Sequence, residues 1–549
     1  MAPRAAAQSD RKIESIPASS GWAQQFLLFA IFFVVLMLLH APLLRLPYFW
    51  DEAGYYVPAA RDLFLHGMLI PQSTPSNAHP PLVMAWLALA WRVFGYSPLV
   101  TRTAMLALSA FSLLGLFRLA RVAANLPVAF ATIALVATYP VYFTESSMAQ
   151  VDLAAAGFTF WALAAYIEDC PGMEVLWFSL AALAKETAIL APLALFGFEL
   201  GGYWVRLRWS EFKWKTFFPP AGRRRHALYL MLPAMPLAGW YAYHYAKAGF
   251  LLGNPEFYRY NMIETLNPLR IPLALGMRFW QVFGYFGLYL LTLAGLLAML
   301  LPPQMAKRKE MAGRQAESRV ALPRIPLWMQ GAFLSVLLAY LACMSVVGGA
   351  VLARYMLPVV PLVILVLVST LWRRVRYWKL LAGAVGIAFA AGLFSNPPYG
   401  FSLEDNLAYR DYVVMHADAI RFLQTRYAGV RVLSAWPASD ELIRPWLGYM
   451  KANASAPFRV VRVEDFSPTQ IDVAAKARGR FDVALVFSTK YQPPHALLEN
   501  WRAWQRTKEH FFGYHRDLLP DDVAQRLGGM VVYHNERNGQ WIAVIAVPN

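Results

Sequence analysis

This sequence contains few charged residues for its length. Only 15% of its 549 residues are Asp, Glu, Lys or Arg, whereas soluble domains carry about 25%. Hydrophobic residues make up 58% of the chain, and apolar runs long enough to cross a bilayer recur along its first 395 residues. The shortage of charge excludes an ordinary soluble protein, and the apolar runs predict an α-helical polytopic membrane protein.

Cysteine is also scarce, since Cys170 and Cys343 are the only two. One falls on a predicted loop and the other inside a predicted helix, so neither a disulfide nor a cysteine-ligated metal site is expected. The sequence lacks a Gly-rich phosphate loop, metal-ligand spacing and internal repeats. The residues themselves therefore indicate no cofactor.

Acidic residues number 33 against 50 basic ones, which gives a net charge of +17. The basic residues do not form an aromatic-interleaved basic domain, so no nucleic-acid partner is expected. They cluster instead in short segments between apolar runs, and such segments stay in the cytoplasm. The three clusters at 205–226, 302–325 and 372–379 are therefore predicted to be cytoplasmic.

These loops predict eleven spans, with residues 1–23 in the cytoplasm and the C-terminus outside. The predicted spans cover 24–43, 99–118, 127–144, 151–167, 173–184, 187–205, 227–246, 276–300, 327–346, 355–371 and 380–395. A long outer loop covers 44–98. Its apolar stretch 79–95 is predicted to lie along the membrane interface, because a span there would place all three basic loops outside.

The tail, 396–549, differs from the transmembrane domain at 24–395. It holds nearly half of the acidic residues and alternates short apolar strands with helices. We predict a small extracytoplasmic α/β domain. The expected strands are RVLSAW, FRVVRV, DVALVFS, MVVYH and IAVIAV, with a hairpin turn at NERNGQW and helices at 409–427, 438–451 and 494–508.

Ionisable residues gather on the predicted outer face of the membrane. A charge at mid-membrane costs about 2.5–3.5 kcal/mol, and the outer face is depleted of Lys and Arg, so such residues need a partner or a function. The residues, which come from six separate segments, are Asp51, Glu52, His79, Arg102, Asp152, Lys185, Glu186 and Arg354.

Each of these residues also has a purely structural interpretation. Asp51 could cap a helix over 52–65, with Glu52 in its first turn. Others could begin a helix, pair locally or reach a lipid headgroup, namely His79, Arg102, Asp152 and Lys185. Arg354 is the hardest to explain in this way, because its neighbours in GGAVLARYMLP offer no acid.

The same residues suit a transfer reaction at the lipid surface. A carboxylate can accept the proton of a hydroxyl nucleophile, which contributes about 10²–10⁴-fold. Fixed Lys and Arg side chains can stabilise a departing phosphate. A base beside a cationic cradle, at the level of the lipid, indicates transfer from a lipid-linked phosphate donor.

The sequence resembles the polytopic glycosyltransferases of the GT-C fold, in the group that contains the protein O-mannosyltransferases and the lipid A aminoarabinose transferase. WDEAGYY (50–56) matches the acidic motif of the first outer loop. AHPPLVMAWLALAWRVFGYSPLVTR (78–102) matches [KH]PPL, an apolar helix and a final Arg. ALAKETAILAPLAL (182–195) matches the short helix pair with its lysine, and LARYMLPVVP (352–361) the basic-Tyr-x-x-Pro segment. The resemblance covers about 45–370.

The resemblance implies an inverting glycosyltransferase that uses a polyprenyl-phosphate sugar at the outer face of a plasma (inner) membrane. The acceptor would be a lipid, a glycan or a protein. The implied catalytic residues are Asp51 as base, Glu52 and Asp152. The implied substrate-binding residues are His79, Arg102, Lys185, Arg259, Arg354 and Tyr355, with Lys185 and Arg354 on the phosphate. Position 78 is Ala where the aminoarabinose transferase has an acid that helps hold a metal, so a divalent metal ion stays an open alternative.

Two other classes of protein also keep charged residues in a membrane domain. A transporter or flippase for lipid-linked sugars or small solutes would show a Gly/Pro-broken helix pair repeated in two halves, and its charges would line a midplane path. A non-catalytic assembly protein would present the tail domain without needing acids, a histidine and cations on one face. The gathering of charges at one face favours the enzyme over both.

Overall fold

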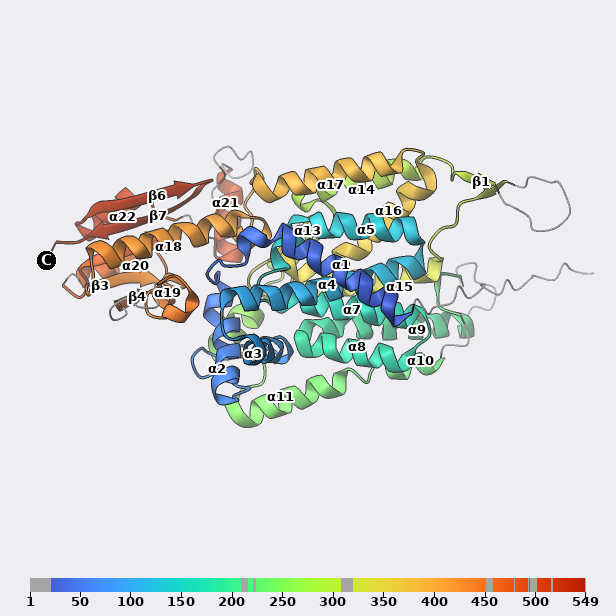
Figure 1. Cartoon of the computed structure of the whole chain (residues 1–549), viewed down its shortest axis with the longest axis horizontal. Coiled ribbons are helices and arrows are strands. Elements are labelled where there is room, and N and C mark those ends of the chain that lie inside the picture. Colours follow the sequence, from blue (N-terminus) through green and yellow to red (C-terminus); the bar gives the residue numbers. More distant parts are fainter. Residues whose placement is uncertain are drawn as a thin grey trace, which may run out of the picture.

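The computed structural model is elongated, with a bundle of helices and a smaller α/β part at one end (Figure 1). It describes residues 21–208, 216–220, 224–307, 319–450, 458–477, 479–491, 493, 501–514 and 517–548. Residues 1–20, most of the predicted cytoplasmic N-terminus, lie outside the described residues. So do parts of two of the predicted basic loops, at 209–215, 221–223 and 308–318.

Long apolar helices form the bundle. Within the described residues, five segments are long and apolar enough to cross a membrane, namely α1 (Trp22–Leu39), α4 (Pro98–Ala123), η3 with α9 (Glu186–Arg208), α13 with α14 (Arg270–Met299) and α15 (Leu327–Val346). Shorter apolar helices pack among them, including α3 (Leu82–Phe94), α5 (Leu126–Thr138), α7 (Asp152–Ile167), α8 (Pro171–Ala184), α16 (Val360–Arg374) and α17 (Trp378–Phe394). The predicted class, a polytopic helical membrane protein, is confirmed, whereas the count of eleven spans stays a prediction.

Three of the predicted spans are interrupted, for local reasons. The span at 127–144 breaks at Pro140, which separates α5 from α6 (Pro140–Glu145). The span at 227–246 breaks before Pro233, between α10 (Arg224–Tyr229) and α11 (Ala234–Ala248). A proline removes a helix hydrogen bond and clashes with the preceding turn. The span at 276–300 bends around Gly287, whose φ is 84°.

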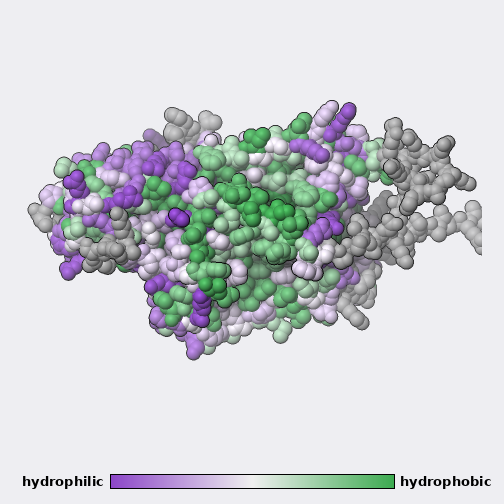
Figure 2. Space-filling model, in the orientation of Figure 1, coloured by the Kyte–Doolittle hydropathy of each residue, from purple (hydrophilic) through white to green (hydrophobic). Residues whose placement is uncertain are grey.

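Hydrophilic residues gather at the two ends of the molecule and apolar residues around its middle (Figure 2). At one end, β1 (Met305–Lys307) and β2 (Arg319–Ala321) form a short antiparallel pair. The backbone N–H of Gln304 donates to the carbonyl of Arg373 at 2.8 Å, so two of the basic segments adjoin. The α/β part lies at the opposite end (Figure 1). This arrangement agrees with basic loops on one side of a membrane and the tail on the other.

The α/β part contains a five-stranded sheet in the order β4-β3-β5-β7-β6. Its strands are β3 (Arg431–Ala435), β4 (Arg459–Val463), β5 (Val483–Phe487), β6 (Met530–Arg537) and β7 (Gln540–Ala546). β3 is parallel to β4 and β5, while β5, β7 and β6 are antiparallel. All five predicted strands are present. The predicted hairpin turn is also present, with positive φ at Asn538 (49°) and Gly539 (79°).

The helices of this part were predicted less well. The predicted helix 409–427 is α18 (Ala408–Arg426). The predicted helix 438–451 is wrong as a single helix, because Pro445 follows α19 (Ala438–Glu441) and begins a short 3-10 turn. Of the predicted helix 494–508, residues 494–500 lie outside the described residues and the rest begins α21 (Arg502–Phe512). Two helices were not predicted, α20 (Pro468–Lys476) and α22 (Pro520–Leu527).

The α/β part shares its apolar core with the first outer segment, which contains α2 (Val57–His66) and α3. Phe49 packs against Tyr412, with ring centroids 5.1 Å apart. Gly54 lies against the ring of Trp436, where a Cβ would come within 2.4 Å of the ring. The WDEAGYY stretch is therefore buried from one side by the tail. The domain boundary at 396 stays a proposal, since this core crosses it.

Candidate active site

Arg354 is the centre of a buried charged cluster. It lies on η7 (Ala353–Met356), in the connection between α15 and α16, and its side chain is 2% exposed. Nη2 donates to Oδ2 of Asp51, Nη1 donates to Oε2 of Glu404 at 2.6 Å, and Nε lies 3.4 Å from Oδ2 of Asp152. Each edge of the guanidinium thus faces a carboxylate.

Lys185 and Tyr355 complete the cationic side of the cluster. Nζ of Lys185 donates to Oδ1 of Asp152 at 2.5 Å and lies 3.9 Å from the centroid of the Tyr355 ring. The guanidinium carbons of Arg278 and Arg354 lie 5.4 Å and 5.7 Å from the same ring. Three cations therefore surround one aromatic ring, an arrangement that the ring quadrupole stabilises.

Asp51 is the most accessible carboxylate on Arg354. Its side chain is 21% exposed, compared with 3% for Asp152 and 4% for Glu404. Asp51 precedes the π-helical turn η2 (Glu52–Tyr56), yet its side chain makes no capping hydrogen bond there. The structure therefore does not support the alternative that Asp51 serves only as a helix cap, because the capping hydrogen bond is not formed.

Glu52 and Arg102 form a separate, fully buried pair. The carboxylate accepts two bonds from Arg102, at 2.7 Å and 3.0 Å, and two more from the backbone N–H groups of Phe49 and Ala149. Both side chains are 0% exposed. The pair joins the outer segment to α4 and to the turn before α7, so it stabilises the fold at this point. Neither side chain contacts Arg354.

His79 lies next to the cluster rather than in it. Its Nδ1 is 2.9 Å from Oε2 of Glu186, the neighbour of Lys185. The preceding Ala78 has a left-handed backbone (φ 58°) and its carbonyl accepts a bond from Trp240 Nε1 at 2.9 Å. Ser76 is 2.8 Å from Nε2 of His244. Helix α11 thereby holds the segment that presents His79.

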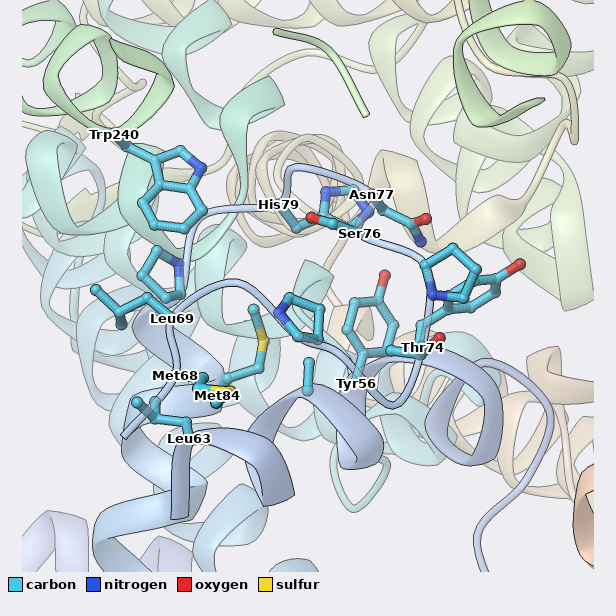
Figure 3. A pocket seen from close by; sticks show the side chains of 15 residues that line it. Tyr56, Leu63, Met68, Leu69, Thr74, Ser76, Asn77, His79, Met84 and Trp240 are labelled. Carbon is cyan, nitrogen blue, oxygen red and sulfur yellow. The ribbon is translucent and has the colours of Figure 1, made fainter. Parts of the chain in front are cut away.

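His79 also lines a small, partly open pocket between the outer segment and α11. Ser76, Asn77 and His79 lie on one side of the pocket, while Leu63, Met68 and Met84 lie on the other (Figure 3). The ring of Tyr56 approaches that of His79 at 5.9 Å. The pocket has a polar wall, an apolar wall and an end close to the charged cluster.

The structure does not bring Arg259 to the cluster. Its side chain is 66% exposed and lies 3.4 Å from Glu264, which is 54% exposed. The nearby Asn261 has a backbone role instead, because its carbonyl and side-chain oxygens accept bonds from the N–H groups of Gly348 and Gly349. Asn261 therefore fixes the segment that leads to Arg354.

Several residues of the cluster were missed in the sequence. They are Glu145 at the end of α6, Gln150, Arg278, Glu404 and Asp405. The available signal was weak: a pair of adjacent acids, Glu404–Asp405, lies about ten residues past the end of a predicted span, as Asp51–Glu52 does. Burial raises the pKa of Glu404 above its ordinary value, and burial beside Glu404 raises the pKa of Asp405 to about 8.

The residues around position 78 do not fit the metal site that the resemblance left open. Ala78 offers a methyl group in place of an acid, and Nδ1 of the adjacent His79 is already bonded to Glu186. No group of three His, Cys, Asp or Glu side chains that could hold a metal occurs among the described residues.

Comparisons with known structures identify the fold. No family model and no curated protein matches the sequence. The structure is similar to ArnT from Cupriavidus metallidurans in the apo state, with a TM-score of 0.52 and 13% identity over 95% of this chain and 98% of ArnT. It is also similar to ArnT bound to undecaprenyl phosphate, with a TM-score of 0.51 and 14% identity over the same shares of the chains. The predicted GT-C fold is therefore confirmed.

Proposed function

We propose that this chain is an integral membrane glycosyltransferase. It transfers a sugar from a polyprenyl-phosphate donor to an acceptor hydroxyl at the outer face of the plasma membrane, with inversion. The observation that carries the proposal is Asp51, an accessible carboxylate held by Arg354 beside Lys185 and Tyr355. The similar fold of ArnT, solved with undecaprenyl phosphate, supports a lipid-linked phosphate donor.

Asp51 accepts the proton of the acceptor hydroxyl as the oxygen attacks the anomeric carbon of the sugar. The bond between that carbon and the phosphate oxygen breaks, and the electron pair leaves with the polyprenyl phosphate. A single displacement inverts the anomeric configuration. General-base help of this kind contributes about 10²–10⁴-fold.

Lys185 and Arg354 stabilise the departing phosphate. The Nη2 edge of Arg354 faces the more open side of the cluster, because its partner Asp51 is the most accessible carboxylate. A donor phosphate that takes over this edge releases Asp51, which is then free to accept a proton. Charge-assisted bonds to a phosphate are the strong ones, and their gain in the transition state is usually the largest catalytic contribution.

The remaining predicted residues have supporting roles in this proposal. Asp152 holds Lys185 and one edge of Arg354. Glu52 and Arg102 hold the segment that carries Asp51. His79 and its pocket lie where the sugar or the acceptor would enter, whereas Arg259 would contact substrate only at the exposed rim.

The direct test is transfer by the purified protein from a panel of labelled polyprenyl-phosphate sugars. Release of polyprenyl phosphate together with a labelled, anomerically inverted product supports the proposal. If reconstituted vesicles instead move a lipid-linked sugar between leaflets without breaking its phosphate bond, the chain is a flippase and the proposal fails.

A further inference from the structure

The chain reaches the Arg354 cluster once more after its last apolar helix, α17. Residues Leu403–Asp405 form a short turn, η8, closed by a capping box between Ser402 and Asp405. The hydroxyl of Thr144 donates to the carbonyl of Glu404 at 2.6 Å, and the hydroxyl of Tyr285 donates to Asp405 at 2.6 Å. Two separate parts of the helical bundle thus hold this turn, one through the backbone of Glu404 and the other through the side chain of Asp405.

The side chain of Glu404 points into the cluster from this fixed turn. Its Oε2 accepts the 2.6 Å bond from Nη1 of Arg354 and a longer one, 3.3 Å, from Nε2 of Gln150. The side chain is 4% exposed. A carboxylate so deeply buried needs a charged partner, and Arg354 is the cation that contacts it.

The position of the Arg354 guanidinium depends on the three carboxylates around it. Two of them, Asp152 and Glu404, are almost fully buried, while Asp51 is accessible. If Asp51 is released during the reaction, the two buried carboxylates alone hold the guanidinium plane. Of these, Glu404 makes the shorter contact, at 2.6 Å compared with 3.4 Å.

We propose that Glu404 is a positioning residue of the active site, which holds Arg354 so that its Nη2 edge faces Asp51 and the donor phosphate. The inference deepens the proposed function and rests on it. It also assigns the tail a direct part in the reaction, because a residue beyond the predicted boundary at 396 contacts the group that stabilises the leaving phosphate.

Glu404→Gln tests this role. The amide keeps an oxygen for Nη1 of Arg354 but loses the charge that fixes the guanidinium. A misplacement of about 1 Å can cost about 10²-fold in rate, so we expect the turnover of Glu404→Gln to fall by about ten- to a hundredfold. Glu404→Asp keeps the charge on a shorter side chain and should recover part of the lost rate.

Glu441→Gln is the matched control. Glu441 is another buried glutamate of the tail, and it pairs with His416 at 2.7 Å, away from Arg354. Its substitution perturbs the same part of the chain without touching the cluster. We expect Glu441→Gln to keep turnover within a few-fold of wild type at equal folded fraction, measured by size-exclusion profile.

A double-mutant cycle separates positioning from a general structural effect. If Glu404 acts through Arg354, the rate loss of Glu404→Gln disappears in the Arg354→Ala background. Additive losses, or an active wild type whose Glu404→Gln variant is equally fast, overturn the role of Glu404. A wild type that transfers no sugar from any polyprenyl-phosphate donor overturns the proposed function itself, so the two failures are distinct.

Discussion

Nη2 of Arg354 donates to Oδ2 of Asp51 across 303 positions of the sequence. The contact joins the connection between α15 and α16 to the stretch that follows α1. Residues from near the beginning and near the end of the bundle's sequence therefore meet in one ion pair. In this pair the side chain of Asp51 is partly exposed to solvent, whereas that of Arg354 is buried. The proposed proton acceptor and the proposed phosphate-binding cation are thus in direct contact.

Asp51→Asn should leave the fold intact and lower transfer strongly. The amide is nearly the same size and can still accept a bond from Arg354, but it cannot accept a proton from the acceptor. We expect transfer to fall by about 10²–10⁴-fold, with a thermal unfolding midpoint near that of wild type, because Arg354 keeps Asp152 and Glu404 as charged partners and the Asp51 side chain caps no helix. The rate is measured with a labelled lipid-linked sugar. A variant as fast as wild type would leave the search for the base to Asp152.

Arg354→Ala should weaken binding of the donor, and Arg354→Lys should restore it only in part. A lysine supplies the charge but not the planar fork that bonds two partners at once. Lys185→Ala should weaken donor binding as well, since Lys185 lies on the same Tyr355 ring. Titration with polyprenyl phosphate measures the three affinities. Unchanged affinity in both alanine variants would remove these residues from the donor site.

Glu52→Gln should destabilise the protein rather than act first on the chemistry. The substitution leaves the guanidinium of Arg102 buried without its charged partner, and breaking a buried pair in this way costs about 3–5 kcal/mol. The effect appears as a lower unfolding midpoint in detergent. The exposed pair of Arg526 and Asp472, 2.8 Å apart, provides the control, because Asp472→Asn should change stability by less than about 1 kcal/mol. Equal midpoints for the two variants would contradict the structural role of the buried pair.

Asp405 should make stability fall as the pH rises. Burial raises the pKa of its carboxyl to about 8 in the folded protein, whereas an unfolded Asp titrates near 3.9. Between about pH 4 and pH 8 the folded state binds more protons than the unfolded state, so each step up in pH removes stability. Asp405→Asn cannot ionise and should lose this part of the pH dependence. Unfolding midpoints measured at intervals from pH 5 to pH 8 test this, and parallel curves for the two proteins would contradict it.

The proposed topology is tested by cysteine labelling from the two sides. With Cys170 and Cys343 replaced by serine and alanine, single cysteines are introduced as Ala306→Cys, beside a basic loop, and Val473→Cys, in the tail. Both positions are exposed. An impermeant thiol reagent added to intact cells should label the tail position alone. Labelling of the Ala306→Cys variant would reverse the proposed sides.

Much of the bundle and of its charged cluster was predictable from the sequence. Runs of apolar residues mark the helices, and the basic loops indicate which helix ends share a face. That reasoning placed Asp51, Asp152, Lys185 and Arg354 together, and the structure shows them in contact. The helix breaks at Pro140 and Pro233 were also encoded locally, although the predicted spans ran through them.

The rest depends on contacts between distant segments. Glu404 was missed because the tail was interpreted as a separate domain, whereas its core is continuous with the first outer segment. Glu145 lay just past the end of a predicted span, where an acid normally faces water. Arg259 was predicted from its place in the outer loop 247–274, but its side chain is exposed beside Glu264, and it is Asn261 on the same helical turn that contacts the segment before Arg354. The pairing of Glu52 with Arg102 required the fold of the turn at Ala149.

The contact between Arg354 and Glu404 has a consequence for how the protein is made. A ribosome that adds about 5–20 residues per second completes Asp51 well before Arg354, which follows 303 positions later, and Glu404 comes another 50 positions after that. Asp51 is therefore synthesised long before its partner Arg354, and Glu404 is the last of the three residues to be made. With the proposed roles of Asp51, Arg354 and Glu404, the site is complete only once the segment after α17 has been made, so a nascent chain that stalls after α17 should lack activity.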